Sequence, residues 1–317
     1  MELYEYKENN KSLVELKPGA FDLEKDIQSI VEANMETLFN IEFVTSEFAL
    51  GQFRLDTLCF DVENNAFVIV EYKKGSSYSV IDQGYSYLSL MLNNKADFIL
   101  EYNENKSNSL KKDDIDWSAS RIIFISPGFN SFQRNSVNFK DIPFELWVIK
   151  RFEGSLISLE ALHPTSGESI RQVQNHNTEI SKVNNELIIY TEEEHIDKMS
   201  DEVLAIFTEI RERLSTYGEA EFVPKKYYVR FSKGNKGVCY IKPRGSRIDI
   251  NIVAGATKKD GTKSKNYFNM DDPKGISSQR TKNYKSGDVS MEYIIPVKSL
   301  HDLDYVEMLI KQKYNTI

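Results

Sequence analysis

Two carboxylates and a lysine interrupt two apolar segments in the first third of the sequence. Asp56 lies within residues 53–62 (FRLDTLCFDV). Glu71 and Lys73 lie within residues 66–74 (AFVIVEYKK). Carboxylate oxygens are the ligands that Mg²⁺ prefers, and a bound divalent cation neutralises a phosphate and lowers the pKa of an attacking water. A neighbouring lysine can stabilise charge in the transition state or position the nucleophile. Together these residue types indicate metal-dependent cleavage of a phosphodiester bond.

The spacing of these residues predicts that they share one face of a β-sheet. Glu71 and Lys73 are two residues apart on one strand, so their side chains project from the same side. The two segments flank a turn at 63–65, which makes them antiparallel neighbours. A two-residue turn fits there in two ways, one pairing Asp56 with Glu71 and the other pairing it with Lys73. Directly paired residues share a face, so either register brings the three together.

The same residues resemble the two halves of the PD-(D/E)XK nuclease motif, as Arg54-Leu55-Asp56 and Val70-Glu71-Tyr72-Lys73. Leu55 stands where the motif has a proline, which many members also lack. The next segment contains Gln83-Gly84-Tyr85-Ser86-Tyr87, which is similar to the QxxxY signature of the RecB-like branch. The resemblance covers about residues 20–160 and is strongest to two-domain bacterial proteins with this nuclease core.

The resemblance implies a role for each matching residue. For catalysis it implies Asp56, Glu71, Lys73, Gln83 and Tyr87, and for a bound Mg²⁺ or Mn²⁺ it implies Asp56, Glu71 and Glu24. Lys73 would serve the nucleophile or the transition state, whereas Gln83 and Tyr87 would orient the substrate or the lysine. Nearby acids that could replace Glu24 in its role are Glu32, Glu36 and Glu47.

Each residue taken alone also has a simpler structural interpretation. Glu71 and Lys73 could form an exposed pair at a strand end, because charged residues mostly lie exposed. Gln83 and Tyr87 could be a helix-surface pair, and Glu24 could be a first-turn acid favoured by the helix dipole. All of these interpretations would have to hold together at the spacing of the motif, which favours the functional one.

Hydrophobic periodicity predicts an α/β first domain over 1–162, and the resemblance implies a restriction-endonuclease-like mixed sheet flanked by helices. Helices are expected at 22–39, 79–92 and 130–138, and strands at 53–62, 66–74, 121–129, 144–152 and 155–162. Residues 163–194 are rich in polar residues and are expected to form a linker. A smaller α+β domain is expected over 195–317, with helices at 197–217 and 299–314, strands at 226–232, 237–242, 247–253 and 289–296, and a basic loop at 254–288.

The second domain is basic, although the whole chain has a formal net charge of −8. Residues 195–317 hold 22 Lys and Arg against 16 Asp and Glu, and residues 225–285 hold 16 against 4. This excess indicates an anionic partner, with a solvated charged face as the alternative. The residues expected to contact nucleic-acid phosphates are Lys225, Lys226, Arg230, Lys242, Arg244, Arg247, Lys258 and Lys259. Along 226–232, alternation assigns Tyr227, Val229 and Phe231 to the core face.

The second domain also resembles a small α/β domain of unknown function that often accompanies nuclease or restriction-like modules. The segments that carry this resemblance are PKKYYVRF (224–231), VCYIKPRGSRIDINI (238–252) and DDPKG (271–275). A shared fold and the domains that occur beside it are associations only, so this resemblance assigns no role by itself.

Further features bound the function and the compartment. No run of about 18 apolar residues is present, which argues against a membrane protein. Cys59 and Cys239 lack disulfide or zinc spacing, the histidines are scattered, and the first residues do not form a secretory signal, so a reducing cytoplasm is expected. We therefore expect a Mg²⁺-dependent endonuclease that acts on nucleic acid in defence or repair, with DNA as the expected substrate. The sequence leaves open whether the protein forms a homodimer. The alternative is a catalytically idle nucleic-acid-binding or regulatory protein that retains the nuclease fold.

Overall fold

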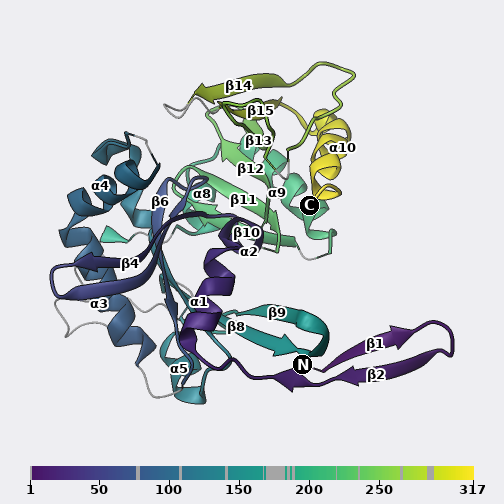
Figure 1. The fold of residues 1–317 in the computed structure, drawn as a ribbon. Helices are drawn as coiled ribbons and strands as arrows, with labels where there is room; N and C mark the ends of the chain where they lie inside the picture. Colours follow the sequence, from purple (N-terminus) through teal and green to yellow (C-terminus); the bar gives the residue numbers. More distant parts are fainter. Residues whose placement is uncertain are drawn as a thin grey trace. The chain divides into compact units, whose positions relative to one another are not determined.

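The chain folds into two units, each with its own sheet and hydrophobic core (Figure 1). The first unit comprises Met1–Asn105 with Leu110–Ile188, and the second comprises Lys106–Ser109 with Ile189–Ile317. The computed structural model describes residues 2–75, 79–106, 109–139, 142–166, 168, 183, 186–187, 190–218, 220–234, 236–264, 267–283 and 289–317. Most of the expected linker, 163–194, lies outside these described residues.

The first unit is built on a mixed seven-stranded sheet with the order β3-β8-β7-β6-β5-β4, and β9 pairs with β8. The strands are β3 (Pro18–Gly19), β4 (Glu42–Leu50), β5 (Phe53–Asp61), β6 (Ala66–Tyr72), β7 (Arg121–Ser126), β8 (Phe144–Phe152) and β9 (Leu156–Leu162). Strands β6, β7 and β8 run parallel, whereas β4, β5 and β6 form an antiparallel meander. A separate hairpin of β1 (Leu3–Lys7) and β2 (Ser12–Leu16) precedes the sheet.

Strands β5 and β6 form the predicted hairpin because both are apolar and their turn is closed by side chains. Every residue of β6 is buried, as expected of a strand covered on both faces. At the turn, the Asp61 carboxylate accepts hydrogen bonds from the backbone N–H of Asn64 at 2.9 Å and from its Nδ2 at 2.6 Å. The register pairs Thr57 with Val70 and, extended by one residue, sets Asp56 opposite Glu71. This is the first of the two registers that the sequence left open.

Helices cover both faces of this sheet, which confirms the predicted fold class. On one face, α1 (Glu24–Glu32) and α2 (Met35–Phe39) pack on the strands through a core that includes Ile27 and Val31. On the other face lie α3 (Val80–Asn93) and α4 (Lys95–Lys106), with core residues such as Leu88 and Phe98. The short helices are α5 (Ser131–Ser136), η1 (Lys112–Asp114), η2 (Trp117–Ala119) and η3 (Glu153–Ser155).

The single helix expected at 22–39 is wrong, because the chain leaves the helical conformation at Asn34. The backbone there has φ −131° and ψ 20°, and the Asn34 Nδ2 donates to the carbonyl of Ile30 at 2.8 Å. Asparagine side chains compete in this way with the hydrogen bonds of a helix. Helix α2 then ends at Asn40, which is left-handed with φ 55°. Strand β4 and helix α4 were not predicted.

Gly84 in α3 marks a close approach between this helix and β8. A Cβ added at this position would lie 2.5 Å from Cζ of the buried Phe144. Overpacking costs about 1–3 kcal/mol, and the better helix propensity of alanine returns about 1 kcal/mol. We therefore expect Gly84→Ala to lower the free energy of unfolding by up to about 2 kcal/mol, measured by chemical denaturation. Gly128→Ala is the control, because no heavy atom lies within 4 Å of its added Cβ; equal effects of the two changes would contradict the packing argument.

The second unit is an antiparallel six-stranded sheet with the order β10-β11-β12-β13-β15-β14. Its elements are α8 (Glu192–Ile196), α9 (Asp201–Ser215), β10 (Ala220–Lys225), β11 (Tyr228–Lys233), β12 (Lys236–Pro243), β13 (Ile248–Thr257), β14 (Ser278–Asn283), β15 (Val289–Val297), η4 (Leu300–Asp302) and α10 (Leu303–Tyr314). One face of the sheet forms a core with α9 and α10. No helix in the described part of either unit has the length and hydropathy that crossing a membrane requires.

Two expectations for this unit need correction. Strand β14 lies inside the stretch 254–288 that was expected to be a loop, since it pairs with β15 along its length. Val229 and Phe231 are fully buried, which confirms their core face, but Tyr227 is 68% exposed. Tyr227 lies in the connection between β10 and β11, before the strand alternation begins at Tyr228.

Candidate active site

The hairpin of β5 and β6 brings the predicted trio together on the face that α3 covers. The Asp56 Oδ2 accepts a hydrogen bond from the backbone N–H of Tyr72 at 2.9 Å, which fixes this carboxylate against the neighbouring strand. The Nζ of Lys73 lies 2.7 Å from Oε1 of Glu71, and both side chains are largely buried, with exposures of 12% and 3%. Two carboxylates and one ammonium group therefore meet where β6 ends.

Helix α3 adds the two predicted polar residues to the same site. The Gln83 Nε2 donates to Oε1 of Glu71 at 2.6 Å and lies 3.0 Å from the Tyr87 hydroxyl. That hydroxyl lies 3.5 Å from Oε1 of Glu71. Burial and the nearby Glu71 raise the pKa of Tyr87 to about 12, so the phenol stays protonated. Gln83 and Tyr87, four residues apart on one face of α3, thus both contact one carboxylate oxygen of Glu71 and do not form a helix-surface pair.

Within the trio, the two buried acids Asp56 and Glu71 repel each other when both are charged. Burial, and then the charge of Asp56, raise the pKa of Glu71 to about 7. Burial also raises the pKa of Asp56, although the N–H of Tyr72 and the charge of Lys73 act against it. For Lys73, burial disfavours the charged form, but the Glu71 carboxylate outweighs it and raises the pKa. The ammonium group therefore stays charged beside the two acids.

One carboxylate oxygen of Glu71 is free to accept a hydrogen bond or to bind a cation. Its Oε1 receives the contacts from Lys73 and Gln83, whereas its Oε2 is buried and has no hydrogen-bond partner. A buried acceptor without a partner costs about 1–3 kcal/mol. A divalent cation prefers carboxylate oxygens and would offset the repulsion between the two acids. The residues present thus fit a hard cation held by Asp56 and Glu71.

Glu24 is not part of this carboxylate pair. The Glu24 Oε2 accepts a hydrogen bond from the backbone N–H of Lys74 at 2.6 Å, two residues after β6 ends. Its charge still contributes to the raised pKa of Asp56. Over the described residues, no three His, Cys, Asp or Glu side chains are arranged to hold a metal ion. The predicted three-carboxylate ligand set is therefore not assembled in this structure.

The alternatives to Glu24 have other surroundings. Glu36 is exposed on α2, and Glu47 lies on β4 in ion pairs with Arg54 and Lys25. The Oε1 of Glu32 accepts hydrogen bonds from Gln28 and Thr57. Of these acids, Glu47 lies nearest to the trio in the sheet, because the β4–β5 register sets it opposite Asp56.

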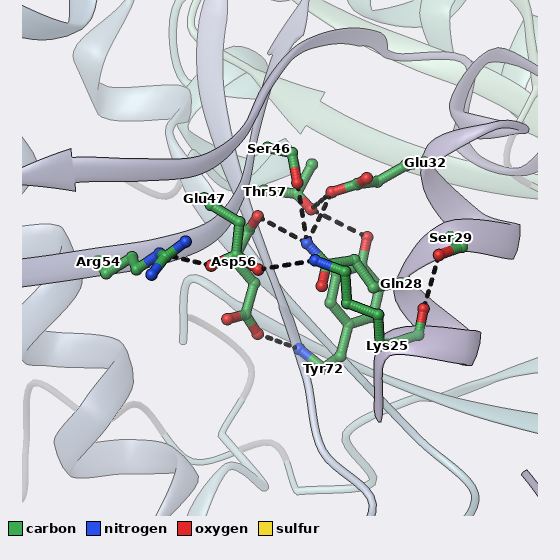
Figure 2. A network of polar contacts seen from close by, with 10 residues as sticks. All are labelled: Lys25, Gln28, Ser29, Glu32, Ser46, Glu47, Arg54, Asp56, Thr57 and Tyr72. Carbon is green, nitrogen blue, oxygen red and sulfur yellow. Dashed lines mark hydrogen bonds and ion pairs between the residues drawn. The ribbon is translucent and has the colours of Figure 1, made fainter. Parts of the chain in front are cut away.

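A buried polar network beneath the site was missed from the sequence (Figure 2). The Nε2 of Gln28 lies 3.1 Å from the Asp56 carbonyl and 2.9 Å from Oε1 of Glu32. Thr57 Oγ1 lies 2.6 Å from the same Glu32 oxygen and 3.2 Å from the Tyr72 hydroxyl. The network links α1 to both strands that carry the acids. Its signal in the sequence was a polar Gln28 three residues before Val31, within the apolar stripe of the helix.

The basic residues predicted in the second unit do not form one patch. Arg244 and Arg247 lie in the turn between β12 and β13 and both pair with Asp249, at 3.1 and 2.7 Å. Burial opposes ionisation of Asp249, but the two guanidinium groups hold its pKa below the usual value. Lys258 and Lys259 follow the other end of β13, whose ten residues span about 33 Å.

The remaining predicted residues lie on the strands toward the Arg244 turn. Lys225 ends β10, Lys226 follows it, and Arg230 lies on β11. Lys242 is half-buried on β12, and burial lowers its pKa. The predicted nucleic-acid contacts are thus divided between two ends of the sheet.

Comparisons with known proteins match the second unit to a family and most of the chain to a relative. Residues 192–317 match the family described as Domain of unknown function (DUF5655). An uncharacterized protein of Haemophilus influenzae is 38% identical over 305 residues, which cover 95% of each chain.

Two solved structures show a partial likeness to this chain. The first, "Structure of EndoMS-dsDNA2 complex", is 16% identical with a TM-score of 0.28 and covers 47% of this chain and 48% of that one. The second, "crystal structure of a repair endonuclease from Pyrococcus abyssi", is 13% identical with a TM-score of 0.24 and covers 46% and 49%. The matched part spans about half the length of each of these structures.

Proposed function

This chain belongs to the same family as the uncharacterized Haemophilus influenzae protein, and we propose that it is a nuclease that hydrolyses phosphodiester bonds in DNA with Mg²⁺ or Mn²⁺. The observation that supports this most is Oε2 of Glu71, a buried acceptor without a partner on a carboxylate that interacts with both Asp56 and Lys73. We assign the activity to defence or repair of DNA. Asp56 and Glu71 would hold the cation, which would lower the pKa of the attacking water and neutralise the scissile phosphate.

Each residue of the site then has a defined task. Tyr72 fixes the Asp56 carboxylate through its backbone N–H, and Gln83 and Tyr87 orient Glu71 through Oε1. Lys73 is positively charged and can donate to an oxygen of the phosphate as negative charge develops there. The site is largely buried, so these charges interact more strongly than they would in water.

The basic second unit is the proposed holder of the nucleic acid. Its excess of Lys and Arg lies within residues 225–285, which contain 16 basic and 4 acidic residues. Contacts of this kind with phosphates weaken steeply with salt. Binding of DNA that does not change between 50 and 200 mM salt would contradict this part of the proposal.

The second candidate is an idle nucleic-acid-binding protein with the same fold. It is favoured by the Glu71–Lys73 ion pair and by the fact that, within the described residues, only two of the three predicted ligands come together. Such a protein would bind nucleic acid without cutting it.

A cleavage assay on the full chain tests the proposal. The protein is incubated with plasmid, single-stranded DNA and RNA, each in Mg²⁺, Mn²⁺ or EDTA. We expect DNA cleavage that depends on the metal and is lost in Asp56→Asn, which keeps the shape but removes the charge. A mobility shift without cleavage would instead support the idle binding protein. The absence of both a shift and cleavage would contradict both functions.

A further inference from the structure

We propose that Lys25 and Arg54, held in place by Glu47, form a phosphate-binding rim that receives the DNA backbone next to Asp56. The inference rests on the proposed nuclease function and names the residues that contact the substrate. Residues 1–194, which include the whole first unit, hold 18 Lys and Arg against 32 Asp and Glu. A unit with this charge repels DNA unless local cations lie at the site.

Glu47 has an unusual backbone for a residue within a strand. Its φ is 56°, in the left-handed region that side chains other than glycine and asparagine rarely adopt. On either side of it, Ser46 pairs with Thr57 and Phe48 pairs with Leu55, so Glu47 faces Asp56 across the strands. Strained residues of this kind persist where the surrounding structure enforces them, and they cluster at functional sites.

Glu47 uses this position to gather two cations (Figure 2). Its Oε2 lies 2.6 Å from Nε of Arg54, and its Oε1 lies 3.4 Å from Nζ of Lys25. The cationic side chains are 67% and 65% exposed, whereas that of Glu47 is 28% exposed. Exposed ion pairs contribute little to stability, so stabilisation does not account for a strained residue here.

The two cations come from different elements and meet at the site. Lys25 lies in the first turn of α1, and Arg54 lies on β5 two residues before Asp56, on the same side of the strand. The carbonyl of Arg54 also lies 3.4 Å from the Tyr87 hydroxyl. The rim is therefore connected both to β5, which carries Asp56, and to α3, whose side chains contact Glu71.

The carboxylate of Glu47 stands in for a phosphate in this arrangement. Guanidinium and ammonium groups bind carboxylates and phosphates with the same charge-assisted hydrogen bonds. A phosphate oxygen of the DNA can thus replace the Glu47 carboxylate as acceptor for Lys25 and Arg54. This exchange would place the backbone beside Asp56 and Glu71, where the cleaved bond must lie.

The test measures binding and cleavage separately in Lys25→Gln, Arg54→Gln and Glu47→Asn. Asparagine is chosen at position 47 because it tolerates a positive φ. Binding of labelled DNA duplexes and single strands is measured in EDTA between 50 and 200 mM salt, and KM and kcat are measured in Mg²⁺. Lys112→Gln is the control, since Lys112 is an exposed lysine of the same unit outside the site.

We expect Lys25→Gln and Arg54→Gln each to raise Kd and KM and to make the loss of affinity over this salt range about three-fold smaller, because one phosphate contact is gone. Glu47→Asn should bind DNA more tightly than the wild type. Cleavage with unchanged KM and salt dependence in both cation variants would overturn the rim and leave the nuclease proposal standing. Weaker binding in both variants without cleavage by any form would support the rim and contradict the nuclease. If the wild type neither binds nor cuts, both are contradicted.

Discussion

Replacing Lys73 with methionine is expected to lower kcat for DNA cleavage by about 10²–10³-fold, because an aimed donor that stabilises developing charge contributes on that scale. Methionine keeps an unbranched side chain in the buried space that Lys73 occupies at the end of β6. We expect the loss in kcat rather than in KM. In the free protein the ammonium group contacts Glu71, and its contact with the phosphate would form only in the transition state, which affects kcat. Single-turnover cleavage rates in Mg²⁺ provide the measurement.

Lys74→Met serves as the control for this change. Lys74 is the next residue along the chain, and its side chain points to the carbonyl of Asp22 rather than to Glu71. We expect its kcat to stay within a factor of about three, as for a surface change outside the reacting groups. Similar losses in the two variants would mean that the lysine of the motif has no special role in the reaction.

Replacing Glu71 with glutamine is expected to stabilise the metal-free protein at pH 8 and to leave its stability nearly unchanged at pH 5. The pKa of Glu71 is raised from 4.5 to about 7 by burial and by Asp56. The folded state therefore binds this proton more tightly than the unfolded state. The stability that this proton contributes is present below pH 4.5 and is lost as the pH rises from there through about 7. This difference corresponds to about 3 kcal/mol at most, which glutamine would recover at pH 8.

The free energy of unfolding of the full chain in EDTA, measured by chemical denaturation at pH 5 and pH 8, tests this expectation. Glu36→Gln is the control, because Glu36 is exposed on α2 and glutamine there relieves no buried charge. The gain at pH 8 should be specific to Glu71→Gln and should disappear when Mg²⁺ is added, since the ion would then compensate the wild-type carboxylate. A destabilised Glu71→Gln at pH 8 without metal would show that the buried acid is already fully compensated within the protein.

The sequence by itself determined the trio and the helix that supports it. Strand alternation places Glu71 and Lys73 on one side of β6 irrespective of what surrounds the sheet. The short turn at 63–65 allows only registers that add Asp56 to them. These relations are local and periodic, so they follow from backbone geometry alone. The i, i+4 spacing places Gln83 and Tyr87 on one face of their helix, whereas the contact of that face with Glu71 was implied by the resemblance and is made by packing.

Tertiary structure decided the remaining features of the site. Whether Glu24 joins the carboxylates depends on how α1 packs against the sheet, and in this structure its carboxylate accepts a hydrogen bond from the backbone of Lys74. The left-handed Glu47 and its cations depend on the pairing of β4 with β5, and strand β14 depends on β15. The periodicity of the sequence does not predict such contacts, because they join residues far apart in the sequence. They depend on how whole elements bury their apolar faces.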